Sequence, residues 1–116
     1  MSEAIDLKDV LERVQNDKEL LLELLDIYQE DFAKRRKALG EAIKNKDFNG
    51  IKESAHSLKG SSGNISAKGM FAHCLKLEQM AKDNDLSQAP EVLKAIDQEF
   101  VQLADHSREI KKYFGK

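Results

Sequence analysis

Apolar residues recur at steps of three and four along almost the whole chain, which is the spacing of one face of an α-helix. A clear run consists of Ile51, Ala55, Leu58, Ser62 and Ile65, with Ser62 in an apolar position. Nowhere does an alternating β-branched run, bounded by turn residues, predict a strand. Leu, Ala, Glu and Lys, which are all good helix formers, are abundant. The sequence therefore predicts an all-α protein.

Breaks between the apolar runs divide the chain into one short helix and four long ones. The expected ranges are residues 5–15, 17–45, 47–64, 67–83 and 89–114. Asn16 with Glu19 three residues later has the pattern of a capping box, and Asp47 is expected to cap the following helix. Pro90 suits the first turn of the last helix. Four long helices with short connections predict an antiparallel four-helix bundle, with the short helix covering an end or a side.

Length and composition limit the class of protein further. The 116 residues suit a single domain over 1–116, and 41% hydrophobic with 34% charged residues exclude a disordered chain. No apolar run approaches the roughly 20 residues of a membrane-spanning helix. A net charge of −2 argues against nucleic-acid binding. The single cysteine and the first residues, which lack a signal-peptide pattern, favour a cytoplasmic location. We expect a monomer.

The stretch "ESAHSLKGSSGN" places a histidine within the third helix. His56 lies about 140° from the apolar stripe on a helical wheel, so it is expected to face solvent. Lys52, Lys59, Gly60 and Gly63 fall on or near the same outer surface. Gly60 follows His56 by one helical turn, and the missing side chain there clears the approach to the imidazole. These residues predict a site that a partner can reach.

An exposed neutral imidazole is a good nucleophile near neutral pH, because its unperturbed pKa is about 6.5. It can accept a phosphoryl group on one ring nitrogen if an acceptor holds the other nitrogen. A lysine on the next turn would stabilise phosphate oxygens. The alternative for Gly60 is an ordinary helix C-terminus. Against this alternative, the apolar stripe continues past Gly60 through Ser62 and Ile65.

The segment "AHSLKGSSGNISA", followed by "MFAHCLKLE", resembles the histidine-containing phosphotransfer (HPt) domain of multistep phosphorelays. The resemblance extends over almost the whole chain. One departure is Ser66, which stands where the family usually has glycine. The matching positions of the motif are Ala55, His56, Leu58, Lys59, Gly60, Ala67, Met70, Cys74, Leu77 and Glu78.

The resemblance implies that His56 accepts a phosphoryl group from an aspartate of a receiver domain and passes it to another. It implies Lys59 as the phosphate-stabilising cation, Gly60 as space for the receiver, and Glu78 as an acceptor for the other imidazole nitrogen. The implied partners are response-regulator receiver domains, a hybrid sensor histidine kinase, or both. Mg²⁺ is expected on the receiver only, with no cofactor, metal site, independent turnover or ATP-dependent kinase activity in this chain.

Other readings of these motifs are weaker. Glu53 and His56 match the Glu-x-x-His of di-iron bundles, but the chain has no second copy. "KGSSG" has its lysine before the glycine, unlike a phosphate-binding loop. "KRRK", residues 34–37, is either a solvated helix face or a surface for anionic partners. A helical adaptor that cannot be phosphorylated is the alternative function, although intact His56 and Lys59 favour the phosphocarrier.

Overall fold

The fold is all-α, as predicted. A computed structural model describes residues 4–115, and within this range the chain forms helices and no strand. The helices are α1 (Leu7–Arg13), α2 (Lys18–Lys44), α3 (Phe48–Asn64), α4 (Lys68–Lys82) and α5 (Ala89–Phe114). The four long helices match their expected ranges to within one residue at each end. The first is shorter than predicted, because Asp6 caps its start and Gln15 and Asn16 have left-handed backbone conformations.

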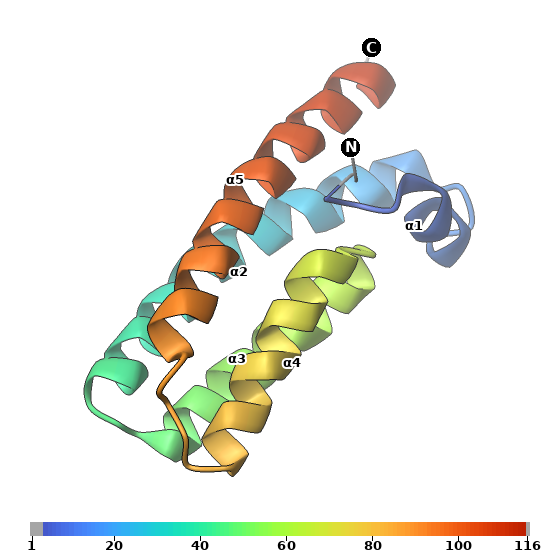
Figure 1. The fold of residues 1–116 in the computed structure, drawn as a ribbon. Helices are drawn as coiled ribbons and strands as arrows, with labels where there is room; N and C mark the ends of the chain where they lie inside the picture. Colours follow the sequence, from blue (N-terminus) through green and yellow to red (C-terminus); the bar gives the residue numbers. More distant parts are fainter. Residues whose placement is uncertain (1–3, 116) are drawn as a thin grey trace.

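The four long helices run antiparallel to their neighbours in sequence and form an elongated bundle (Figure 1). Helices α2 and α5 have 27 and 26 residues, whereas α3 and α4 have 17 and 15. The α3–α4 hairpin is therefore shorter than the α2–α5 pair, and α1 lies beside the turn between α3 and α4 (Figure 1). None of the helices within residues 4–115 is long and apolar enough to cross a membrane.

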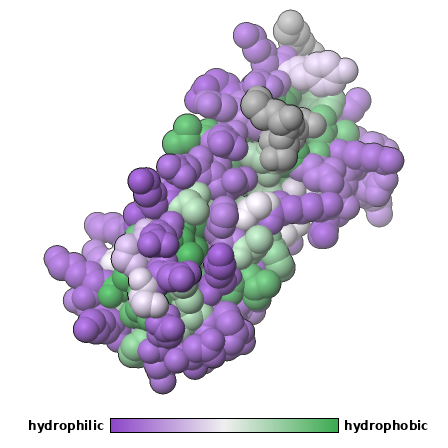
Figure 2. Space-filling model, viewed as in Figure 1, coloured by the Kyte–Doolittle hydropathy of each residue, from purple (hydrophilic) through white to green (hydrophobic). Residues whose placement is uncertain are grey.

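The core runs along the inner faces of the helices. Phe32 of α2 and Phe100 of α5 stack with ring centroids 3.9 Å apart. Between α2 and α3, the hydroxyls of Tyr28 and Ser62 share a buried hydrogen bond of 2.8 Å, which satisfies both polar groups. Most of the surface in view is hydrophilic, with separate hydrophobic patches (Figure 2). The core thus fixes the outward face of α3 relative to α4.

One predicted helix cap is confirmed and another is wrong. Asp47 caps α3 as predicted, because its carboxylate accepts from the Gly50 amide at 3.0 Å. The predicted cap at Asn16 is wrong. Asp17 caps α2 instead, accepting from the Leu20 amide at 3.0 Å, and Asn16 precedes it with a φ of 62°. Pro90 lies in the first turn of α5, as expected.

Replacing Asp17 with alanine should lower the free energy of unfolding by about 1 kcal/mol, because the first turn of α2 would lose its side-chain cap. Replacing Asn16 with glycine should not destabilise the protein, since glycine adopts a positive φ without steric cost. Thermal unfolding followed by circular dichroism would compare the two variants. An equal loss of stability in Asn16→Gly would contradict this assignment of the cap.

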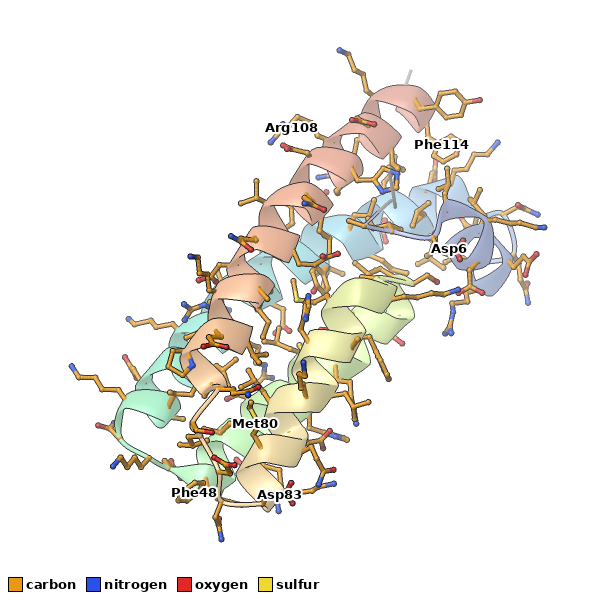
Figure 3. The ribbon with its side chains drawn as sticks, viewed as in Figure 1. Asp6, Phe48, Met80, Asp83, Arg108 and Phe114 are labelled. Atoms are coloured by element: carbon orange, nitrogen blue, oxygen red, sulfur yellow. The ribbon has the colours of Figure 1, made fainter. Side chains whose placement is uncertain are left out.

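Polar contacts hold α1 against the α3–α4 turn. Ser66 has a φ of 57°, a conformation that favours glycine, and its hydroxyl donates to Asp9 at 2.6 Å. The Asp6 amide donates to the Ser66 carbonyl at 3.0 Å, and the Lys68 ammonium donates to the Asp6 carboxylate at 2.8 Å. Figure 3 shows Asp6 at the end of the bundle where these elements meet. The departure from glycine at Ser66 thus comes with a side-chain bond to α1.

Candidate functional site

His56 lies in the middle of α3 and faces outward. Its side chain is 68% exposed, whereas Ile51, Ala55 and Leu58 of the same helix are buried. The helical wheel therefore predicted its direction correctly. The helix continues to Asn64, so Gly60 is not the C-terminus of the helix. A rigid helix with a buried inner face holds the imidazole at a fixed point on the surface.

Glu78 of α4 contacts both candidate side chains of α3, His56 and Lys59. Its Oε2 lies 2.9 Å from His56 Nδ1, and its Oε1 accepts from the Lys59 ammonium at 2.6 Å. The Glu78 side chain is only 8% exposed, so one nearly buried carboxylate joins the imidazole and the ammonium. The expectation that Glu78 lies within hydrogen-bond reach of the ring is met.

The environment of Glu78 favours its charged form. The hydrogen bond from Lys59 and, less strongly, the contact with His56 lower its pKa below the ordinary value of 4.5, although burial acts in the opposite direction. The carboxylate is therefore ionised near neutral pH. An ionised carboxylate can only accept hydrogen bonds, so the proton of a neutral His56 ring belongs on Nδ1. The lone pair of the ring is then on Nε2.

The predicted position of Lys59 is wrong in part. Lys59 was expected on the open surface beside His56, but its side chain is only 19% exposed. The long side chain folds toward α4, where Glu78 binds the ammonium and the ring of Phe71 lies 6.0 Å from Nζ. Because it shares Glu78 with His56, Lys59 remains next to the site rather than projecting into solvent.

The surface around His56 has two glycines. Beyond the adjacent residues and the backbone of its own helix, a Cβ built on Gly60 would have no atom within 4 Å, and its φ is not positive, so neither packing nor backbone conformation requires glycine there. At Gly63, a Cβ would meet the Phe71 ring at 3.6 Å, an ordinary contact, and Gly63 is half-buried. Lys52 is exposed one turn before His56. Gly60 is therefore the open position of the predicted surface.

The other candidate groups lie elsewhere. His73 and His106 are half-buried, and Nδ1 of His106 accepts from the Ile5 amide at 3.2 Å. Cys74 packs in the core, and burial raises the pKa of its thiol to about 12. Within residues 4–115, no group of three or more His, Cys, Asp or Glu side chains is arranged to hold a metal ion. His56 is thus the most exposed histidine of the three.

Two apolar side chains of α4 lie near this site without a predicted role. Phe71 and Leu75 are 38% and 46% exposed. Phe71 precedes Glu78 by seven residues, which places both on the same face of the helix. That face therefore carries an apolar residue and a polar residue at heptad spacing. That mixed face could have indicated an apolar surface next to the histidine.

Fold and site together define a class: a helical bundle with one exposed histidine that is hydrogen-bonded to a carboxylate. A search of solved structures matched the crystal structure of histidine-containing phosphotransfer protein B (HptB) from Pseudomonas aeruginosa PAO1. The match has a TM-score of 0.86 and 24% sequence identity, and it covers 97% of this chain and 99% of that chain. This likeness supports the fold. No curated protein sequence matched the chain.

A comparison with protein families matched the Hpt domain over residues 23–106, which is most of the chain. The chain belongs to the Hpt domain family. Its class of function is therefore phosphotransfer in phosphorelays, as the resemblance implied. The matched range includes α3 and α4 with His56, Lys59 and Glu78.

Proposed function

We propose that His56 is a phosphocarrier residue. It accepts a phosphoryl group from an aspartate of one receiver domain and passes it to an aspartate of another. The observation that carries the proposal is the pairing of a 68% exposed imidazole with a nearly buried acceptor, Glu78, at Nδ1. This pairing leaves Nε2 as the nucleophile. The receivers belong to response regulators, to a hybrid sensor histidine kinase, or to both.

The transfer step needs no proton movement through solvent. The Nε2 lone pair forms the new N–P bond while the P–O bond to the receiver aspartate breaks, and the aspartate leaves as a carboxylate. The phosphorylated ring keeps its proton on Nδ1 and becomes positively charged. Glu78, ionised and 2.9 Å away, stabilises that charge, and the reverse step restores the neutral ring. We assign Mg²⁺ to the receiver and no cofactor or ATP-dependent activity to this chain.

Phosphotransfer profiling tests this proposal. Each receiver domain of the organism is first phosphorylated and then mixed with the purified protein. The phosphate that appears on this chain is measured, and it should be labile in acid and stable in alkali. Rapid loss of label from at least one receiver, with label appearing at His56, is the expected result. No transfer from any receiver would instead favour the adaptor alternative, in which the bundle binds receivers without carrying phosphate.

Replacing Lys59 with alanine should slow transfer about tenfold without preventing receiver binding. One charge-assisted contact contributes roughly 1.5–3 kcal/mol, and Lys59 already shares its charge with Glu78, so the lower end applies. Rapid-quench measurement of the transfer rate, together with the dissociation constant of the complex, would separate chemistry from binding. An unchanged rate would mean that Lys59 only neutralises Glu78.

Glu78→Gln should change the acid stability of the protein. The pKa of Glu78 is lower in the folded chain than its ordinary value of 4.5, so the stabilisation by its ionised form is complete above that pH. This stabilisation is lost as the pH falls through the lower pKa that Glu78 has in the folded chain. The stability advantage of the wild type over Glu78→Gln should therefore shrink between pH 6 and pH 3. Melting temperatures across this range measure it, and a constant difference would contradict the ionised state of Glu78.

A further inference from the structure

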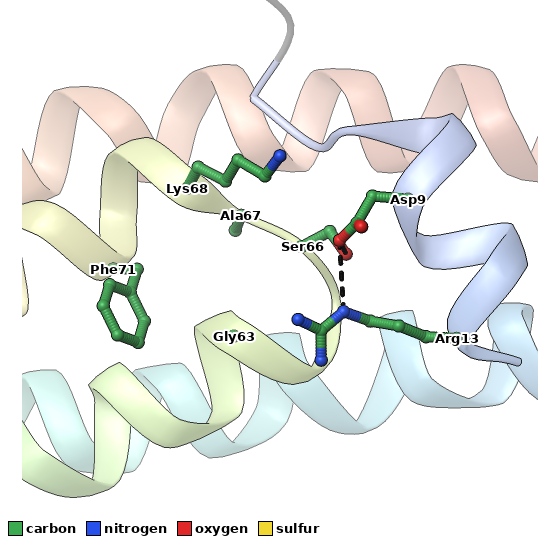
Figure 4. A pocket seen from close by; sticks show the side chains of 7 residues that line it. All are labelled: Asp9, Arg13, Gly63, Ser66, Ala67, Lys68 and Phe71. Atoms are coloured by element: carbon green, nitrogen blue, oxygen red, sulfur yellow. Dashed lines mark hydrogen bonds and ion pairs between the residues drawn. The ribbon is translucent and has the colours of Figure 1, made fainter.

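A hollow of about 210 Å³ lies where α1 meets the α3–α4 turn (Figure 4). Its lining residues come from three parts of the chain: Asp9 and Arg13 of α1, Gly63 of α3, and Ser66, Ala67, Lys68 and Phe71 of the turn and α4. The contacts that hold α1 against the turn therefore also complete this hollow. A dry cavity of about 150 Å³ is enough to bind benzene, so the hollow can hold one apolar side chain.

The hollow continues the face of α3 that carries His56. Gly63 follows His56 by seven residues, which returns to within about 20° of the same direction and lies about 10 Å further along the helix axis. Gly60 occupies the turn between them, with open space where its side chain would be. A standard interface covers about 800 Å² on each partner, or a radius of roughly 16 Å. A receiver centred on His56 would therefore cover the hollow as well.

The walls and rim of the hollow differ in chemistry. Phe71 forms an apolar wall and is 38% exposed, and Leu75 extends the apolar surface by one turn of α4. On the rim, Nε of Arg13 donates to Asp9 at 3.1 Å, and Figure 4 shows its two terminal guanidinium nitrogens directed away from Asp9. An aromatic wall beside an arginine is a combination that is common in interface hot spots.

We propose that this hollow is the anchor point for the receiver domain, and that it takes one aliphatic side chain flanked by a carboxylate that pairs with Arg13. This inference rests on the proposed function, because the receiver is its occupant. The hollow acts in binding and selects among receivers, whereas His56, Lys59 and Glu78 carry the chemistry. Helix α1 thus contributes to partner choice although it lies outside residues 23–106 of the family match.

The test measures binding and phosphorylation separately. A receiver found by transfer profiling is titrated calorimetrically with the wild type and with Phe71→Ala, which removes the apolar wall. Phosphoramidate then phosphorylates each protein without a receiver: its P–N bond breaks, the N–P bond to His56 forms, and ammonia leaves. We expect Phe71→Ala to weaken receiver binding at least about tenfold, a larger effect than its effect on the rate with phosphoramidate, because the Phe71 ring also lies 6.0 Å from Nζ of Lys59.

A second variant tests the hollow independently, in case Phe71→Ala does not fold. In Gly63→Leu the new Cβ makes an ordinary contact with Phe71, and the longer side chain fills the hollow instead of emptying it. It should weaken binding by a similar factor while improving helix propensity. Val101→Ala is the matched control, because Val101 is 60% exposed on α5, which contributes no lining residue. Its affinity should equal that of the wild type.

The charged rim has its own pair of variants. Arg13→Ala should weaken binding about fivefold or more and make it less sensitive to salt. Arg108→Ala is the control, because Arg108 is also exposed and also pairs with an aspartate of its own helix, Asp105 at 3.0 Å. Figure 3 shows Arg108 projecting outward from α5, on the side of that helix away from α1. Its loss should leave the affinity unchanged.

The outcomes distinguish the two proposals. If the wild type exchanges phosphate with a receiver but Phe71→Ala or Gly63→Leu, whichever remains folded, binds it with wild-type affinity, the anchor is wrong and the phosphocarrier stands. If the wild type neither exchanges phosphate with any receiver nor accepts it from phosphoramidate, both proposals are overturned. Equal weakening by Val101→Ala would also overturn the anchor, because the effect would not be specific to the hollow.

Discussion

Phosphoryl acceptance should disappear in His56→Gln, while the melting temperature stays close to that of the wild type. The glutamine side chain has no nucleophilic nitrogen, so no N–P bond can form. Its amide can still donate to Glu78, which keeps the nearly buried carboxylate hydrogen-bonded. Since the His56 side chain is 68% exposed, the change in stability should be below about 0.5 kcal/mol. Labelled phosphate from a phosphorylated receiver measures acceptance.

The other histidines provide matched controls. His73→Gln and His106→Gln should accept phosphate at the wild-type rate, because both side chains are half-buried and lie outside the His56–Glu78 pair. His106→Gln should lose some stability, since its ring accepts from the Ile5 amide. Label retained by His56→Gln, or lost in His73→Gln, would overturn the assignment of the phosphoacceptor.

Helix periodicity predicted most of the fold because burial of one helical face is a repeating signal over many residues. A helix cap depends on the conformation of a single residue, so the residue that caps a helix is harder to predict than the helix itself. Asn16 and Asp17 are both good cap residues, and Glu19 favoured Asn16. In the structure Asn16 adopts a left-handed conformation to close the loop, so the next residue begins the helix. Sequence pattern alone does not separate these two arrangements.

The direction of His56 could be predicted because it depends on one helix only. The double contact of Glu78 could not, since it requires the relative height of α3 and α4. A helical wheel gives the direction of Lys59 at its Cα but not the path of its long side chain, which folds back onto α4. For the same reason, the bond between Ser66 and Asp9, 57 residues apart, and the hollow that it helps to form were not predicted.

Gly60→Gln should slow phosphotransfer about a hundredfold without lowering the melting temperature. Gly60 has ordinary helical backbone angles and open space around its missing Cβ, so the first atom of the new side chain meets no neighbouring side chain. Removing glycine from a helix interior gains up to about 1 kcal/mol of stability. The glutamine side chain would instead stand one turn from His56, where the receiver must approach. A displacement of about 1 Å between reacting groups can slow a reaction about a hundredfold.

Gly60→Ala is the control that separates crowding from helix propensity. It gains the same helix stability with only a methyl group, so its melting temperature should rise as much while its transfer rate falls far less. Phosphoramidate should phosphorylate all three proteins at similar rates, because a small donor avoids the added side chain. If Gly60→Gln transferred phosphate from a receiver as fast as the wild type, the open space at Gly60 would have no part in receiver access. If it unfolded, the ordinary helical environment described for Gly60 would be wrong.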